Sequence, residues 1–283
     1  MVLLMCTVLA IGCAGAVGLS EEADHSSYTD FVILTTTDMH GKCWDMNLLR
    51  GTEEKNNMLR VSSAVRQIRE AFGKDNVLLL DNGDLFQGTP VSQVQLSRKA
   101  AGESSDPLVM ALCLNEIKYD AFILGNHEFN FAWNTMHETY QWLEDNGVRV
   151  LAANAVWDGS DLLHAAGENV FTPYFVKTVT VNGREHKIGI LGLENGDISR
   201  WDLPSNYPGI RFAHPENESY SSAYEASLYI PQMQAEGCEF IVVSYHGGIG
   251  ETDEPLVFGA NSENQGKRIA EEAEDIDMLI LGH

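Results

Sequence analysis

The sequence predicts an α/β fold, and three observations lead to that prediction. Short apolar runs rich in β-branched residues alternate along the chain with longer segments of helical period. Several of these runs are apolar without interruption, which is typical of strands covered on both faces. The 283 residues are 44% hydrophobic and 9% aromatic, so the chain can bury a substantial core and carries no compositional sign of disorder. We therefore expect one large α/β domain.

The first half of the chain is expected to contain three strands and two helices. A helix is predicted over 58–72, because apolar residues recur there every three or four positions and Gly73 follows. A second helix is predicted over 134–146. The strands are short, apolar and bounded by turn residues, and they lie at 31–35, 77–80 and 121–124.

The second half is expected to contribute five more strands and one helix. Asn182 and Gly183 form a strong hairpin signal between two of these strands. A helix is predicted over 264–273, between the last two strands. The five strands are expected at 149–153, 174–181, 187–193, 240–244 and 278–281.

The N-terminal segment indicates export. Residues 1–19 are apolar and carry no charge, but they are short for a membrane span, so we interpret them as a secretory signal peptide. A small-x-small cleavage site lies at 14–16, and 10–13 form a loose lipobox ending at Cys13. A retained membrane anchor and a wrongly assigned start remain alternatives. The expected location is periplasmic, cell-surface or extracellular, with membrane contact only through a lipid or an uncleaved leader.

The charge balance limits the possible partners. Forty-one acidic residues face 18 basic ones, which gives a formal net charge of -23. A broad basic surface for a nucleic-acid polymer or for anionic lipid is therefore not expected. A chain this acidic that acts on a phosphate needs local cations, and metal ions can supply them.

Polar residues follow five of the predicted strands at the point where each strand ends. In open α/β sheets the carboxyl ends of the strands line the ligand crevice, so these residues are expected to converge. Each motif alone is more often a simple turn, but five such strand ends together favour a common site. The motifs are DMHG at 38–41, DNGD at 81–84, GNHE at 125–128, YHGG at 245–248 and GH at 282–283.

The converging residues are typical ligands of divalent metal ions. Carboxylate oxygens and imidazole nitrogens suit Zn, Mn, Fe, Ni or Co, and the sequence does not decide among these ions. Six ligands are too many for one tetrahedral ion, but they fit two ions that share a bridging carboxylate, a common device for phosphoryl transfer. The six are Asp38, His40, Asp84, Asn126, His246 and His283.

These motifs, read as DMHG, NGDLFQGTP, GNHEFN, YHGG and the terminal GH, resemble the signature blocks of the calcineurin-like metallophosphoesterases. They are most similar to the 5'-nucleotidase family, which includes the 2',3'-cyclic-nucleotide 2'-phosphodiesterase/3'-nucleotidases. The resemblance extends from about Phe31 to the end of the chain. It implies a layered β-sandwich flanked by helices, with the ligands at the C-terminal ends of the strands.

The resemblance also implies roles for single residues. Asp84 would bridge two metal ions, and a hydroxide bridging them would attack phosphorus. His127 would be the catalytic group beside the phosphoryl oxygens or the leaving alkoxide. Many 5'-nucleotidases have an Asp three residues after that His, where this chain has Asn130, so we expect His127 to be held less strongly in its protonated form. One ion would be bound by Asp38 and His40, and the other by Asn126, His246 and His283. No organic cofactor is implied.

The substrate class follows from the same comparison. GNHEFN, together with 198–202 and 262–264, resembles the cyclic-nucleotide branch more than the 5'-nucleotidase branch. We therefore expect small-molecule nucleotides as substrates, namely 2',3'-cyclic nucleotides and 3'-nucleotides. The alternative is a 5'-nucleotidase or UDP-sugar hydrolase.

The C-terminal end departs from the family pattern. The family has Gly-His-x-His where this chain ends at Gly282 and His283. We therefore interpret 28–283 as an N-terminal metallophosphoesterase domain that is truncated, without the nucleotide-binding C-terminal domain, and we expect this chain alone to be inactive. An alternative of another class is a catalytically dead remnant that binds only a metal or a partner.

Overall fold

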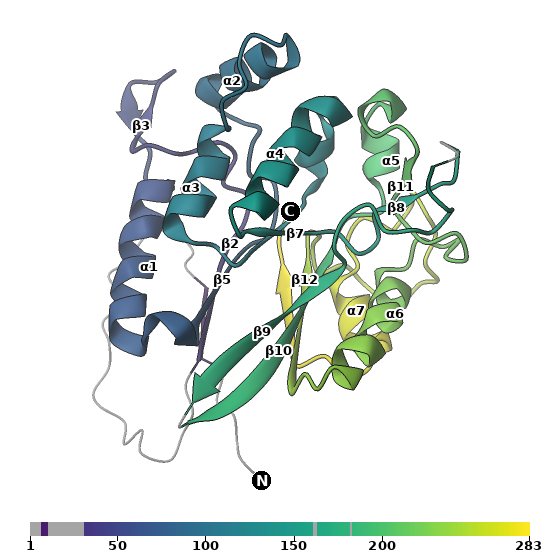
Figure 1. The fold of residues 1–283 in the computed structure, drawn as a ribbon. Helices are drawn as coiled ribbons and strands as arrows, with labels where there is room; N and C mark the ends of the chain where they lie inside the picture. The colour runs from purple at the N-terminus through teal and green to yellow at the C-terminus, as the bar shows by residue number, and fades with distance from the viewer. Residues whose placement is uncertain (1–6, 11–30, 161–162, 182) are drawn as a thin grey trace.

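The protein is built from two stacked β-sheets with helices on their outer faces, as the computed structural model shows (Figure 1). The structure describes residues 7–10, 31–160, 163–181 and 183–283. This arrangement confirms the predicted α/β fold and the layered sandwich flanked by helices. The two sheets are described first, because their strand ends carry the candidate site.

Among the described residues, the first sheet has five strands, and every adjacent pair in it is parallel. One edge strand lies inside the segment assigned to the signal peptide, whereas residues 1–6 and 11–30, with Cys13 and the cleavage site, lie outside the described residues. In spatial order the strands are β1 (Thr7–Ala10), β2 (Val32–Thr36), β5 (Val77–Asp81), β6 (Ala121–Ile123) and β7 (Arg149–Leu151).

The second sheet has four strands and is mixed. Its last two strands in spatial order form an antiparallel hairpin, as the turn signal at Gly183 predicts, although Asn182 itself is not described. The other pairs are parallel. In spatial order the strands are β13 (Met278–Leu281), β12 (Phe240–Tyr245), β10 (Arg184–Leu193) and β9 (Tyr174–Val181).

The core consists of layers that follow the two-residue period of the strands. In β5, Leu78 and Leu80 join the cluster between the two sheets, whereas Val77 and Leu79 join the cluster under the helices. All four side chains are almost completely buried. A strand that is buried on both faces has a continuous apolar sequence. This is why β5 could be predicted from the sequence.

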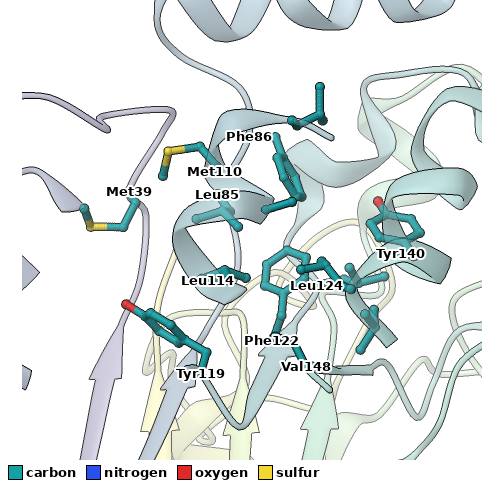
Figure 2. Packing of buried hydrophobic residues seen from close by; sticks show 14 of the residues in the cluster. Met39, Leu85, Phe86, Met110, Leu114, Tyr119, Phe122, Leu124, Tyr140 and Val148 are labelled. Carbon is teal, nitrogen blue, oxygen red and sulfur yellow. The ribbon is translucent and has the colours of Figure 1, made fainter. Parts of the chain in front are cut away.

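Helices cover the outer face of each sheet. Figure 2 shows the cluster beneath the helices of the first sheet, where Phe86 lies above Phe122 and Leu124 with Tyr140 beside them. The longer helices that contribute to this cluster are α1 (Met58–Phe72), α2 (Pro90–Ala100), α3 (Val109–Ile117) and α4 (Trp133–Asp145). The second sheet is covered by α6 (Ser222–Ala235) and α7 (Gly266–Glu272).

Short elements complete the fold. Two small sheets pair β3 (Met46–Asn47) with β4 (Thr52–Glu53), and β8 (Val156–Trp157) with β11 (Ile210–Arg211). The one-turn helices are η2 (Lys74–Asn76), η3 (Asn126–Phe129), α5 (Ile198–Trp201) and η4 (Pro204–Asn206). Within the described part of the chain, no helix has the length and apolar character that crossing a membrane requires.

Candidate metal centre

The structure brings the polar ends of five strands to one place. Two clusters of possible ligand atoms form there, and within each cluster all atoms lie within 4.8 Å of one another. Asp84, which follows β5, belongs to both clusters. One cluster adds Asp38 and His40 from the end of β2, and the other adds His246 and His283 from the ends of β12 and β13.

Asn126 joins the second cluster through its neighbour. Its Oδ1 lies 2.8 Å from Nδ1 of His283, and the backbone nitrogen of His283 donates to Oδ2 of Asp38 at 3.1 Å. His283 therefore touches residues of both clusters. All six residues that the sequence predicts as ligands lie together in space.

The loops after β2 and β5 are held together by three backbone hydrogen bonds. Asp38 donates to the carbonyl of Gly83 at 2.9 Å, and His40 donates to the carbonyl of Asp84 at 2.9 Å. Gly41 donates to the carbonyl of Leu85 at 2.8 Å. The first two motifs therefore form one paired loop, and this pairing places Asp38 and His40 beside Asp84.

The backbone of four of the six predicted ligands is strained. Among the described residues, seven non-glycine residues have a positive φ, and four of them are predicted ligands. Left-handed backbone costs free energy in L-residues and accumulates at functional sites, although Asp and His tolerate it better than most. The four are Asp38 at 55°, His40 at 49°, Asp84 at 57° and His283 at 70°.

Glu128 is a buried carboxylate to which the sequence reasoning assigned no role. It accepts hydrogen bonds from the backbone nitrogens of Asp84 at 2.8 Å, Leu85 at 2.9 Å, Phe86 at 3.3 Å and Gly125 at 2.8 Å. Burial and the nearby charge of Asp84 raise the pKa of Glu128 to about 7, and the hydrogen bonds oppose that shift. Glu128 thus fixes the backbone of the second motif to that of the third.

Two histidine rings are oriented by backbone carbonyls. Nδ1 of His40 lies 3.0 Å from the carbonyl of Gln87, and Nδ1 of His246 contacts the carbonyl of Asn82. A carbonyl oxygen only accepts, so Nδ1 carries the proton in each ring and Nε2 is left for a ligand. This arrangement is the one found around metal-binding histidines.

The surroundings of one buried histidine nitrogen show whether the site fits a metal ion. Nε2 of His246 is buried and lacks a well-directed hydrogen bond among the described residues, although Oδ2 of Asp84 lies only 3.2 Å away. These two atoms are close together without a hydrogen bond between them, so both could coordinate the same metal ion. The donor set and this nitrogen therefore fit a divalent cation.

The pKa shifts of His246 and Asp84 both favour a positive charge beside the carboxylate of Asp84. Burial lowers the pKa of His246, but the close carboxylate of Asp84 outweighs burial and raises that pKa to about 9. Burial raises the pKa of Asp84, and the interactions with His246 and His127 outweigh it and lower that pKa. A divalent cation bound by this pair would compete with a proton on His246.

His127 lies at the edge of this site. Its Nε2 is 3.9 Å from Oδ2 of Asp84, and its ring packs edge-on against that of His40 at 5.4 Å. Its backbone nitrogen donates to Oδ1 of Asp84 at 2.9 Å. Its Nδ1 contacts Oδ1 of Asn130 at 2.5 Å, so Asn130 is the ring's partner.

Glu194 is a second carboxylate that the sequence reasoning missed. It follows β10 directly and is fully buried, and neither carboxylate oxygen has a hydrogen-bond partner among the described residues. Burial raises its pKa well above the ordinary value, and the charges of Glu128 and Asp84 add to this shift. The signal was available, because LENGD follows an apolar strand in the same way as the other motifs.

Comparison with known proteins gives one family and several relatives. The family model of the calcineurin-like phosphoesterases matches residues 31–283. A 2',3'-cyclic-nucleotide 2'-phosphodiesterase/3'-nucleotidase of Haemophilus influenzae is 31% identical over 267 residues, which cover 92% of this chain and 37% of that protein. A 5'-nucleotidase of Vibrio cholerae is 27% identical over 275 residues, which cover 96% of this chain and 43% of that protein.

The fold is also similar to that of a solved calcineurin-like phosphoesterase. The calcineurin-like phosphoesterase YfkN from Bacillus subtilis superposes with a TM-score of 0.71 at 28% identity, covering 89% of this chain and 71% of that one. The chain spans less than half the length of the two curated relatives described above.

Proposed function

The chain belongs to the calcineurin-like phosphoesterase family, and on that premise we propose that the protein hydrolyses phosphate esters of nucleotides at a site for two divalent metal ions. The observation that carries this proposal is the sharing of Asp84 by two clusters of ligand atoms. One carboxylate common to two such groups is the pattern expected of a bridged pair of ions. The proposal concerns the activity of the whole protein, and the described chain carries the proposed metal ligands.

The ligands divide as the two clusters do. Asp38 and His40 would hold one ion, and Asp84 would bridge to the second. Asn126, His246 and His283 would hold the second ion. When bound, two divalent ions supply Lewis acidity, which offsets the charge of a phosphate and activates water for attack on phosphorus. Zn, Mn, Fe, Ni and Co all suit these donors.

The residues of the chain prepare the site for that chemistry. Backbone carbonyls fix the rings of His40 and His246 so that each presents Nε2. His127 extends Nε2 toward the same centre from the opposite loop. In its protonated form, the ring would donate from Nε2 and could stabilise negative charge on the phosphoryl oxygens or protonate the leaving alkoxide.

We propose 2',3'-cyclic nucleotides and 3'-nucleotides as the substrates. The support is the GNHEFN motif, whose Asn130 contacts His127, and the 31% identity to a relative named for these activities. The second candidate is a 5'-nucleotidase or UDP-sugar hydrolase, which the 27% identity to a 5'-nucleotidase favours.

We also propose that the protein is exported. The uncharged apolar segment 1–19 supports this proposal. Sequencing the N-terminus of the mature protein tests it: a start after residue 10 shows processing, and it would also remove β1 from the edge of the first sheet. A mature protein that begins at Met1 and stays inside the cell contradicts it.

The test of the enzymatic proposal measures phosphate-ester hydrolysis in the full-length protein and in this chain. The substrates are 2',3'-cyclic AMP, 3'-AMP and 5'-AMP, each with added Mn²⁺ or Zn²⁺ and with a chelator. We expect metal-dependent cleavage of the first two by the full-length protein. Preference for 5'-AMP would support the 5'-nucleotidase alternative and would still be consistent with the proposed metal site.

Hydrolysis that is equal with metal and with chelator would contradict the metal site. A full-length protein that binds metal but cleaves none of the three substrates supports the remaining alternative, a remnant that binds only a metal or a partner.

A further inference from the structure

A chain of hydrogen bonds leads away from His127 to a carboxylate in a distant part of the sequence. Nδ1 of His127 lies 2.5 Å from Oδ1 of Asn130, and Nδ2 of Asn130 donates to Oδ1 of Asp202 at 2.7 Å. Asp202 lies 72 residues after Asn130, directly after α5. The GNHEFN motif offers His127 only the neutral partner Asn130, and the structure adds the carboxylate of Asp202 behind it.

We propose that Asp202 is a positioning residue that fixes the orientation of His127 through the side-chain amide of Asn130. The reason is the chemistry of the three groups. A carboxylate accepts hydrogen bonds, so the NH₂ group of Asn130 must face Asp202. The amide oxygen then faces His127, and Nδ1 must be the ring nitrogen that carries the proton.

Without Asp202 this orientation is not determined. An amide side chain can turn by 180° and exchange its oxygen for its nitrogen at little cost when nothing distinguishes its two ends. A turned Asn130 would offer an NH₂ group to Nδ1, which would favour the other tautomer. Asp202 therefore selects the tautomer whose Nε2, free of the ring proton in the neutral form, points toward Asp84.

Asp202 can do this because its own segment is fixed against the turn that carries His127. Nδ2 of Asn206 donates to the carbonyl of Phe129 at 3.1 Å, and the hydroxyl of Tyr207 donates to the carbonyl of Asp202 at 3.2 Å. The rings of Phe129 and Tyr207 pack edge-on at 6.4 Å. Two of these contacts join 202–207 to η3, and the bond between Tyr207 and Asp202 lies within that segment.

The first test exchanges the two side chains. The consequence for hydrolysis rests on the proposed function, so it is measured in the full-length protein with its metal. Asn130→Asp alone places two carboxylates face to face, and we expect kcat to fall about 10-fold or more, in the range known for outer partners of metal-site histidines. Asn130→Asp combined with Asp202→Asn restores an acceptor toward His127 and a donor behind it, so we expect most of kcat to return.

The control separates positioning from simple loosening of the segment. Asn206→Ala removes the contact to Phe129 but leaves the amide of Asn130 and its two partners intact. Asp202→Ala should lower kcat about 10-fold and change KM less than about twofold, whereas Asn206→Ala should leave kcat within about twofold. The proposal is overturned if the exchanged pair is no more active than Asn130→Asp, or if Asn206→Ala matches Asp202→Ala.

The second test does not depend on activity. Nitrogen-15 NMR of histidine-labelled chain, at alkaline pH where imidazole is neutral, reports which ring nitrogen of His127 carries the proton. We expect an Nδ1–H tautomer in the native chain and a mixture of tautomers in Asp202→Ala. An unchanged tautomer in Asp202→Ala overturns the proposal. If the native protein cleaves no nucleotide, the proposed function fails, and this spectrum still decides the role of Asp202.

Discussion

Oε2 of Glu128 accepts a hydrogen bond at 2.8 Å from the backbone nitrogen of Asp84, although 44 residues separate the two in sequence. The same oxygen accepts from Gly125, and the other carboxylate oxygen accepts from Leu85 and Phe86. One buried side chain thus satisfies four backbone donors of two loops. Asp84 is the residue common to both ligand clusters, so Glu128 sets the position of the centre of the site.

We predict that Glu128→Gln destabilises the protein and weakens metal binding together. The amide keeps one accepting oxygen and turns its NH₂ group toward backbone N–H groups, which leaves buried donors unsatisfied. Such groups cost about 1–3 kcal/mol, so we expect a loss of about 2 kcal/mol in the free energy of unfolding. Urea denaturation and a zinc titration measure the two effects.

The matched control is Glu271→Gln, the same change at an exposed position of α7. It should alter the free energy of unfolding by less than about 0.5 kcal/mol. If both variants unfold at the same urea concentration, Glu128 does not hold the loops in the way that we describe.

Metal stoichiometry should distinguish a shared ligand from an unshared one. Asp84 belongs to both clusters, so Asp84→Ala should reduce binding at both positions, whereas Asp38→Ala should leave the cluster of Asp84, His246 and His283 able to hold an ion. We expect a lower metal content in Asp84→Ala than in Asp38→Ala, measured by elemental analysis after equilibration with Zn²⁺.

Hydrolysis by the full-length protein should fall more than about 100-fold in Asp84→Ala, because removing a ligand costs more than removing an outer partner. Equal metal content in the two variants would contradict the bridging role of Asp84.

The pH dependence of stability should reveal Asp81. Its carboxylate is fully buried, and burial raises its pKa to about 8, although hydrogen bonds from Thr36 and Gly83 oppose the shift. The folded state then holds the proton more tightly than the unfolded chain, where the pKa is about 4. The stability that this group contributes is full below about pH 4, and it is lost as the pH rises toward 8.

Asp81→Asn removes this titration and keeps a group of the same shape. The amide still accepts from Gly83 and can donate to the hydroxyl of Thr36. We expect the variant to gain stability relative to the native chain as the pH rises from about 5 to about 8, by up to about 1.4 kcal/mol per pH unit. Urea midpoints of both proteins across that range measure the difference, and parallel curves would show that Asp81 does not titrate there.

Much of the fold was predictable because its signals are local. Most strands of the two sheets are short apolar runs, and α1 has a clear helical period that ends at Gly73. The strand β1 was not predicted, because its residues lie in the segment interpreted as a signal peptide. Three of the longer helices were not predicted. The apolar run of α3 shows no period, Pro231 lies inside α6 where a break is expected, and the cap and first residue of α2, Thr89 and Pro90, were read only as part of a motif.

The same distinction applies to the candidate site: residues with a local sequence signal could be predicted, and contacts between distant residues could not. The six proposed ligands follow strand ends, so the sequence shows them directly. The contact of Glu128 with Asp84 and that of Asp202 with Asn130 join residues 44 and 72 positions apart, and no local pattern reports such a contact. The left-handed backbone of Asp38 and His40 is likewise a result of loop pairing, since neither residue requires it.

The last prediction concerns the close approach of loops at Gly83. Its φ is 89°, and a Cβ there would lie 2.6 Å from the backbone nitrogen of Gly125 and 2.7 Å from Nδ1 of His246. Gly102 has a φ of 69°, but a Cβ there would meet nothing within 4 Å. The two glycines therefore share the backbone strain of a substitution and differ only in crowding.

We expect Gly102→Ala to cost about 1 kcal/mol, the typical penalty of left-handed backbone for an L-residue. Gly83→Ala should cost at least about 2 kcal/mol more, because its neighbours are backbone and a ring whose Nδ1 is already bound to the carbonyl of Asn82. Since His246 must move to admit the methyl group, zinc affinity should fall in Gly83→Ala and stay unchanged in Gly102→Ala. Urea midpoints and zinc titrations of the pair decide the matter: equal losses of stability with unchanged zinc affinity would mean that strain alone, and not the contact with His246, requires glycine at position 83.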